Sequence, residues 1–397
     1  MTDWQNDEYD PEGFFGRDDL VEHIIKTLAD PQAEQQRSRA MLVQGPASRG
    51  KTWLLCRVHE WLSDSARYRP LLAEKGVDRL AVCFFKGDDF QSHERAYPDE
   101  QVQELIHHLL AMLWEALHAH CPGLPWPRNI QTDKPSERRA GILDMLKGSH
   151  HQTLQNLITA QIDQVELPVL IIILDGMEEI DPGLLKNFEF EFLHELFRNP
   201  RLRLLASRRV DSPAYVWRKP LIKLQNKVFP LTPFQSSDEQ IAHLIGPEKP
   251  QSDVEAIKDQ MKMYTWGNPG ANAFLVDCAR KNGDQIAEEC IQTCLEHLMR
   301  SAGQSEPIDP RYFDYVRQMA TQFYGIHSQG IGRDKLNQVL GGASDHDRDT
   351  ILGHLQSRGI GYFGKSGNYV LHPEFVELFQ ELLLRQGGAL PQPPVAE

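Results

Sequence analysis

The stretch 45–52 constrains this chain more than any other, because it reads Gly-Pro-Ala-Ser-Arg-Gly-Lys-Thr and matches the pattern GxxxxGK[ST] without a mismatch. It lies between a short apolar run at 40–44 and a helical pattern that begins near Thr52. In such a loop, backbone amides surround a phosphate, the lysine reaches the outer phosphates and the hydroxyl ligates Mg²⁺. The sequence therefore predicts a site for a nucleoside triphosphate with Mg²⁺, formed by Gly45, Pro46, Ala47, Ser48, Arg49, Gly50, Lys51 and Thr52.

A second signal is the apolar run 170–174, which is followed directly by Asp175. Continuous Val, Ile and Leu residues are typical of a strand buried on both faces of a parallel sheet. A carboxylate at the end of such a strand is well placed to complete the magnesium shell together with Thr52. Glu178 and Glu179 follow, and either can orient or deprotonate an attacking water, a choice that the sequence leaves open.

A third signal is Arg208, which follows a strand pattern at 201–207. A guanidinium at the end of that strand can reach the γ-phosphate and sense its hydrolysis, and the alternative is a plain surface arginine. The chain contains no Asn-Lys-x-Asp tetrapeptide, the usual guanine-reading element. The sequence therefore favours an adenine nucleotide, ATP or ADP.

The order of strand and helix patterns predicts the architecture. Strand patterns alternate with helical ones in the first part of the chain, which indicates a doubly wound α/β domain with a parallel sheet. Helical patterns alone follow, and the end of the chain shows three helical patterns and a hairpin, the outline of a winged helix. We expect an acidic tail at 1–12, a P-loop domain at 13–233 with a helical insertion at about 90–165, a helical domain at 234–304, a winged helix at 305–386 and a disordered tail at 387–397.

The charge balance bears on partners and location. In 397 residues there are 42 Lys and Arg against 56 Asp and Glu, a net charge of −14, which opposes nonspecific nucleic-acid binding. The expected recognition helix, 345–358, has three aspartates against two arginines, so we expect no nucleic-acid partner. No apolar run approaches the roughly 20 residues that span a bilayer. Since the first thirty residues also lack a secretory core, we expect no membrane association and a cytoplasmic location.

The six cysteines show no CxxC pattern. Cys290 and Cys294 are spaced for one helix face, but no histidine pattern accompanies them. We therefore expect buried reduced thiols.

Taken together, these motifs resemble a STAND-class nucleotide switch, the class of P-loop ATPases that includes the NACHT and NB-ARC families. The run Asp-Gly-Met-Glu-Glu at 175–179 is similar to the NACHT form of the Walker B motif, although that family usually has aspartate where Glu178 stands. Phe14-Phe15-Gly16-Arg17 resembles the N-terminal motif that lies near the adenine, which implies that Phe15 and Arg17 bind nucleotide.

Two further segments carry the resemblance beyond the P-loop domain. Trp266-Gly267-Asn268-Pro269 resembles the GxP motif of the helical lid, whose proline, here Pro269, packs on the base. Val370-Leu371-His372-Pro373 resembles the MHD segment of the winged helix, with Pro373 in place of its aspartate. In that segment the histidine, here His372, touches the ADP β-phosphate, and the alternative is a capping histidine in a turn.

The resemblance spans about residues 13–386 and implies an ASCE/AAA+-like P-loop NTPase with a helical lid and a winged helix. It also implies slow ATP hydrolysis, a closed state held by ADP, and opening by ATP that allows a homo-oligomer to form. Members usually carry an effector domain before this core and a sensor after it, so we expect effector and sensor to be separate protein partners in a defence-type signalling complex. The alternatives are an AAA-like DNA-associated loader or initiator, and a nucleotide-clamped scaffold without turnover.

Overall fold

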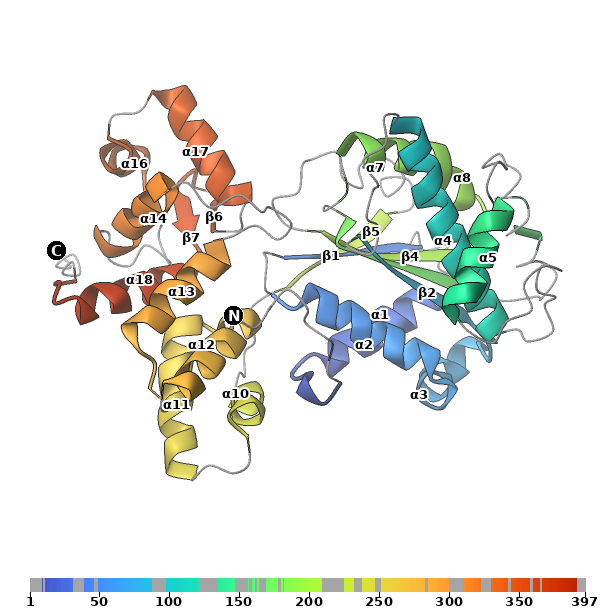
Figure 1. Cartoon of the computed structure of the whole chain (residues 1–397), viewed down its shortest axis with the longest axis horizontal. Helices are drawn as coiled ribbons and strands as arrows, with labels where there is room; N and C mark the ends of the chain where they lie inside the picture. The colour runs from blue at the N-terminus through green and yellow to red at the C-terminus, as the bar shows by residue number, and fades with distance from the viewer. Residues whose placement is uncertain are drawn as a thin grey trace.

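The computed structural model describes the chain in two lobes, which Figure 1 shows side by side: a sheet lobe, within residues 9–231, and a helical lobe, within residues 238–390. The described residues are 9, 11–30, 39–45, 49–87, 98–120, 135–146, 156, 159–160, 163, 169–177, 180, 182–208, 225–231, 238–246, 251–282, 285–299, 310–322, 330–341, 344–357, 360–364 and 366–390.

The sheet lobe is built on five parallel strands in the order β2-β3-β4-β1-β5. All residues of β3 are buried, as the apolar run in the sequence predicts. The doubly wound parallel sheet is therefore confirmed, and its strand order puts the carboxyl end of β1 beside that of β4, with β3 next along. The strands are β1 (Ala40–Gln44), β2 (Ala81–Lys86), β3 (Leu170–Asp175), β4 (Leu202–Arg208) and β5 (Gln225–Pro230).

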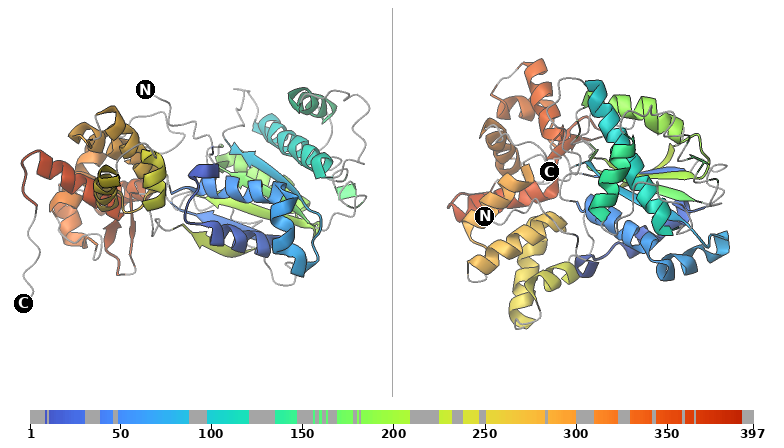
Figure 2. Two further views of the ribbon diagram at one scale, coloured as in Figure 1. Left: turned by 90° about the horizontal axis from the view of Figure 1, so that it is seen from below. Right: turned by 45° about the vertical axis from the view of Figure 1, so that its right-hand side comes forward.

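Helices cover both faces of this sheet (Figures 1 and 2). Because side chains alternate along a strand, Ile172 packs into one apolar cluster and its neighbours Ile171 and Ile173 into the other. One face carries α1 (Asp18–Leu28), α2 (Lys51–Ser63) and α3 (Ser65–Leu72), and the other carries α4 (Pro98–His120), α5 (Pro135–Leu146), α7 (Pro182–Phe188) and α8 (His194–Leu196), the last two joined by a π-helical turn (Glu189–Leu193).

The helical lobe contains the predicted three helices and hairpin of a winged helix, with β6 and β7 antiparallel. It also contains α18 (Pro373–Arg385), a helix that the sequence analysis did not assign. The other elements are α10 (Asp238–Ile245), α11 (Gln251–Thr265), α12 (Pro269–Lys281), α13 (Glu288–Met299), α14 (Pro310–Gln322), α16 (Arg333–Val339), α17 (Asp345–Ser357), β6 (Gly361–Phe363) and β7 (Tyr369–Leu371).

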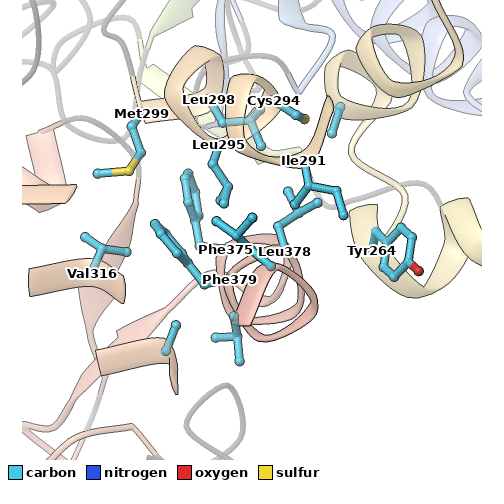
Figure 3. Packing of buried hydrophobic residues seen from close by; sticks show 14 of the residues in the cluster. Tyr264, Ile291, Cys294, Leu295, Leu298, Met299, Val316, Phe375, Leu378 and Phe379 are labelled. Carbon is cyan, nitrogen blue, oxygen red and sulfur yellow. The ribbon is translucent and has the colours of Figure 1, made fainter. Parts of the chain in front are cut away.

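A single apolar cluster runs through this lobe. Leu295 of α13 and Val316 of α14 pack with Phe375 and Phe379 of α18, as Figure 3 shows. Residues of α10 to α13 and of α14 to α18 thus share one core. The predicted boundary near residue 305 lies outside the described residues, and the domain limits stay predictions.

Two cysteines differ from the expectation of reduced thiols. Cys278 of α12 and Cys290 of α13 form a disulfide, with their Cα atoms 5.7 Å apart. The sequence pattern highlighted Cys294 as the neighbour of Cys290, but Cys294 is a buried free thiol. The pairing depends on how α12 packs on α13, which spacing along one helix does not reveal. In the described part of the chain, no helix has the length and apolar character required to cross a membrane.

Candidate nucleotide-binding site

The motif at 45–52 lies on a strand–loop–helix, as its chemistry requires. β1 ends at Gln44, Gly45 follows it, and Lys51 is the first residue of α2. The Lys51 ammonium donates a hydrogen bond to the Gly45 carbonyl oxygen, with 3.0 Å between the two atoms. Pro46, Ala47 and Ser48, which the motif also predicts as site residues, lie outside the described residues.

Gly50 is the point where two other parts of the chain approach the loop. Its φ of 75° is in the left-handed region that favours glycine. A Cβ atom at this position would lie 3.2 Å from Nη1 of Arg17 and 3.6 Å from Cγ of Pro269. The structure therefore places two of the predicted nucleotide-binding residues, Arg17 and Pro269, against the same glycine.

Positive charge is concentrated around this loop. Arg17 donates from Nη1 to the carbonyl oxygen of Arg49 at 2.8 Å. Burial, together with the nearby charge of Arg49, lowers the pKa of Arg17 to about 10. Lys51 follows Arg49 by two residues, so the basic side chains of Arg17, Arg49 and Lys51 lie at the same loop. A site for a polyphosphate needs such a concentration of positive charge.

The buried guanidinium of Arg49 reaches out of the loop to the helical lobe. Its Nη2 lies 2.5 Å from Oε1 of Glu374 in the first turn of α18, and both side chains are only 2% exposed. The same Oε1 accepts a hydrogen bond of 3.2 Å from Nδ2 of Asn268. Asn268 also caps α12 by accepting from the amide of Ala271. One carboxylate therefore joins the loop 45–52, the N-terminal cap of α12 and the first turn of α18.

Within the part of the chain that the structure describes, hydrogen bonding at this junction is incomplete. Nε and Nη1 of Arg49 and Oε2 of Glu374 are buried and have no hydrogen-bond partner among these residues. Buried polar groups are nearly always hydrogen-bonded, so donors left over on a buried guanidinium next to a phosphate loop fit a site for an anionic ligand.

The carboxylate predicted to hold Mg²⁺ lies at the end of β3. Asp175 is buried, and its Oδ1 accepts a hydrogen bond of 2.5 Å from the Ser207 hydroxyl. The backbone amide of Gly176 donates in turn to that hydroxyl oxygen at 3.2 Å. Mg²⁺ is usually held by one or two protein oxygens together with substrate phosphates, and Thr52 with Asp175 fits this preference.

Ser207 is a residue that the sequence analysis missed. It lies at the end of β4, which is hydrogen-bonded to β1 on one side and to β3 on the other. The signal was present, since Ser207 is the first polar residue after the apolar run 204–206. The strand pattern pointed to Arg208 instead. The structure also brings Arg208 to this edge, opposite Gln44 of β1, and its carbonyl oxygen accepts a hydrogen bond from the Gly45 amide. Glu178 and Glu179 lie outside the described residues.

The segment predicted to lie near the base contacts α10. The Phe15 ring lies 5.3 Å, centroid to centroid, from the ring of His243 in α10. Gln240, also in α10, donates to the carbonyl oxygen of Pro269. The structure thus brings the segment of Phe15 and Arg17 close to that of Pro269, which is far from it in the sequence.

His372 immediately precedes α18 and is its N-terminal capping position. Its ring lies 5.3 Å from the ring of Tyr362, and its amide donates to the Ile360 carbonyl oxygen. Burial lowers the pKa of this imidazole, with a smaller opposing effect from Glu374. In the described contacts it is Glu374, two residues further on, that reaches the phosphate loop. No sequence signal set Glu374 apart, because acidic residues are common in the first turn of any helix.

No family model matches the sequence, and no curated protein matches it. The fold is similar to that of the Walker-type ATPase PABY2304 of Pyrococcus abyssi, with a TM-score of 0.54, 14% identity, and coverage of 94% of this chain and 97% of that chain. It is also similar to the ORC2 protein of Aeropyrum pernix, solved in ADPNP-ADP complexes, with a TM-score of 0.51, 13% identity, and coverage of 96% and 97%. The chain has an AAA+-like P-loop NTPase fold. At these identities the likeness shows the fold alone, and this fold does not single out the STAND or NACHT class.

Proposed function

We propose that this protein binds ATP and ADP with Mg²⁺ at the loop 45–52 and works as an ATPase whose nucleotide state sets its conformation. The observation that carries this proposal is the cluster of two buried arginines, Arg17 and Arg49, with the half-buried Lys51. Arg17 and Lys51 donate to carbonyl oxygens of the loop itself. Arg49 uses one nitrogen for Glu374, and its other two have no partner among the described residues. A polyphosphate supplies the negative charge and the acceptors that such a cluster needs.

The proposed roles follow from position. Lys51 and the loop amides hold the β- and γ-phosphates, and Thr52 with Asp175 holds the metal. Ser207 fixes the Asp175 carboxylate through the hydrogen bond described above. Phe15, Arg17 and Pro269 lie on the side where the base is expected, Arg208 senses the γ-phosphate, and Glu178 or Glu179 orients the water.

The switch rests on the meeting of three modules at one loop. A ligand shifts a conformational equilibrium only as far as it binds one arrangement better than the other. A nucleotide at this loop touches groups of the sheet lobe, the lid and the winged helix, so its terminal phosphate can favour one arrangement and, with it, nucleotide-dependent self-association. Separate effector and sensor subunits and a defence role rest on the sequence resemblance alone, and nothing in the fold or the comparisons adds support to them.

Calorimetric titration of the full chain with ADP and with ATP tests the proposal, with light scattering of the same samples to follow mass. We expect both nucleotides to bind, and Lys51→Ala to weaken binding by about 100-fold, because a charge-assisted contact to phosphate is lost. Lys26→Ala is the matched control, since Lys26 is exposed on α1 and pairs with Glu22. A wild-type chain that binds neither nucleotide contradicts the proposal.

Turnover separates an ATPase from a nucleotide-clamped scaffold. In a single-turnover assay, Glu178→Gln or Glu179→Gln is expected to slow hydrolysis by about 100-fold or more, because general-base assistance is removed. An unchanged rate in both variants supports the scaffold.

A DNA-associated ATPase is the second candidate, and the winged-helix arrangement of α14, α16, α17 and the β6–β7 hairpin is the observation that favours it. Against it, α17 exposes Asp345 and Asp349, whose side chains are 66% and 68% accessible. Our expectation that nucleic acid is not a partner is not confirmed by these findings. Fluorescence anisotropy with duplex DNA distinguishes the two candidate functions. An affinity for DNA that falls steeply as the salt concentration rises favours the second candidate.

A further inference from the structure

The contact between Arg49 and Glu374 joins segments 325 residues apart in the sequence. Both groups are removed from water, and a buried ion pair repays its desolvation only when its remaining hydrogen bonds are made. Here Nε and Nη1 of Arg49 and Oε2 of Glu374 have no hydrogen bond to any other described residue. The ion pair therefore contributes more to the relative orientation of its two segments than to the stability of the fold. An anion that makes more hydrogen bonds to Arg49 can replace the Glu374 carboxylate.

The guanidinium of Arg49 is also placed where it can interact with a bound phosphate. Arg49 lies two residues before Lys51, and its carbonyl oxygen is held by Arg17, so its backbone is fixed within the loop. A γ-phosphate adds negative charge at the same loop. At low effective dielectric, two anions that share one buried guanidinium repel each other strongly.

Glu374 is equally well placed to transmit a change. It lies in the first turn of α18, which packs against α11, α13 and α14. The apolar cluster in Figure 3 ties α18 to these helices through Phe375, Leu378 and Phe379. A displacement of Glu374 therefore moves the helical lobe as a body.

We propose that Glu374 sets the preference of this site for a nucleoside diphosphate over a triphosphate, by acting as the counter-anion of Arg49 until a triphosphate takes its place. With a diphosphate bound, Arg49 keeps its contact to Glu374 and the lobes stay joined. With a triphosphate bound, the guanidinium turns to the terminal phosphate and α18 is released. This inference rests on the proposed nucleotide binding.

The test compares affinities for ADP and for the non-hydrolysable analogue AMP-PNP in the full chain. Glu374→Gln keeps the size and hydrogen-bonding capacity of the side chain but removes its charge. We expect the affinity for AMP-PNP to rise about tenfold and that for ADP to change by less than about threefold. Glu381→Gln is the control, because Glu381 lies on the same helix, where it pairs with Arg385, and it is not among the groups that contact Arg49 in the described structure; both affinities are expected to stay unchanged.

A double-mutant cycle shows whether Arg49 carries the effect. In an Arg49→Gln background, Glu374→Gln is expected to leave the ratio of the two affinities unchanged. Equal changes for ADP and AMP-PNP, or no change for either, overturn the inference. If the wild type binds neither nucleotide, the proposed function itself has failed, and that result is distinct from an unaltered ratio.

Hydrogen exchange on the wild-type chain tests the same idea without a variant that has to fold. We expect amides in the first two turns of α18 to exchange about tenfold faster with AMP-PNP than with ADP. Equal protection in the two complexes overturns the inference.

Discussion

The core of the helical lobe and the junction between the lobes are both buried, but they differ in chemistry. The core is apolar, and Leu295, Phe375 and Phe379 fill it. The junction is charged: Arg49 and Glu374 form an ion pair in it, and some of their polar atoms have no hydrogen-bond partner in the described part of the chain.

This difference indicates which contacts stay formed in every state of the protein and which can be replaced by a contact with a ligand. Apolar packing gains free energy in proportion to the area buried and needs no ligand, so it keeps the helical lobe in one piece. A charged contact in a dry site depends on which anion is present. Stability is therefore expected to depend mainly on the core, and nucleotide preference on the junction.

The largest expected effect tests the core. Phe379 is 1% exposed, and its ring lies 4.9 Å from that of Phe313. Phe379→Ala is expected to lower the free energy of unfolding by about 4 kcal/mol, because it removes buried apolar surface and leaves a cavity. Denaturant unfolding followed by circular dichroism measures this. The ratio of the affinities for ADP and AMP-PNP should stay that of the wild type. A changed ratio would contradict the separation between a core that sets stability and a junction that sets nucleotide preference.

The disulfide is the second test of the lobe. Replacing Cys278 and Cys290 together by serine is expected to lower the free energy of unfolding by about 3 kcal/mol, the effect of opening a closed loop of this length. The same unfolding experiment is run with and without a reductant. Reductant should destabilise the wild type and leave the double variant unaffected; an equal response of both contradicts a disulfide in the protein.

Asn268 allows a finer test of the difference between core and junction. Its side chain both caps α12 and donates a hydrogen bond to Glu374. Asn268→Ala is expected to cost about 1 kcal/mol of stability through the lost cap and to shift nucleotide preference toward AMP-PNP. Asp64→Ala is the matched control, because Asp64 caps α3 by accepting from the Ala66 amide. It should cost a similar amount and leave the preference unchanged; an equal shift in both variants contradicts the role of the junction.

The smallest effect is a pH dependence at the edge of the junction. Burial lowers the pKa of His372 below its ordinary value of 6.5, so the unfolded chain binds the proton more readily than the folded one. The stability that this imidazole contributes is complete above pH 6.5 and is lost as the pH falls toward the folded-state pKa. Unfolding free energies measured across this range should fall less steeply for His372→Gln than for the wild type; identical slopes would contradict the shift.

Local patterns predicted much of the fold. The apolar run before Asp175 is a fully buried central strand, and the helical spacing from Val102 to Leu117 falls within α4. The motif at 45–52 predicted the turn between β1 and α2 in the same way. These features are encoded by residues close together in the sequence, so a single chain reveals them.

The features that the sequence did not predict depend on contacts between separate helices, strands and loops. Ser207 acts on Asp175 because β4 is hydrogen-bonded to β3, and Cys278 pairs with Cys290 because α12 packs on α13. Glu374 reaches Arg49 only once both lobes are folded. Helical periodicity marks a face as buried, but it does not say which charged side chain will lie against the phosphate loop.

Small-angle X-ray scattering from the full chain in three states, without nucleotide, with ADP and with AMP-PNP, tests most directly whether the terminal phosphate controls the joining of the lobes. We expect the radius of gyration to be the same without nucleotide and with ADP, and to increase with AMP-PNP in the wild type but not in Lys51→Ala. Identical scattering in all three states, at concentrations where calorimetry shows the nucleotides bound, would contradict it.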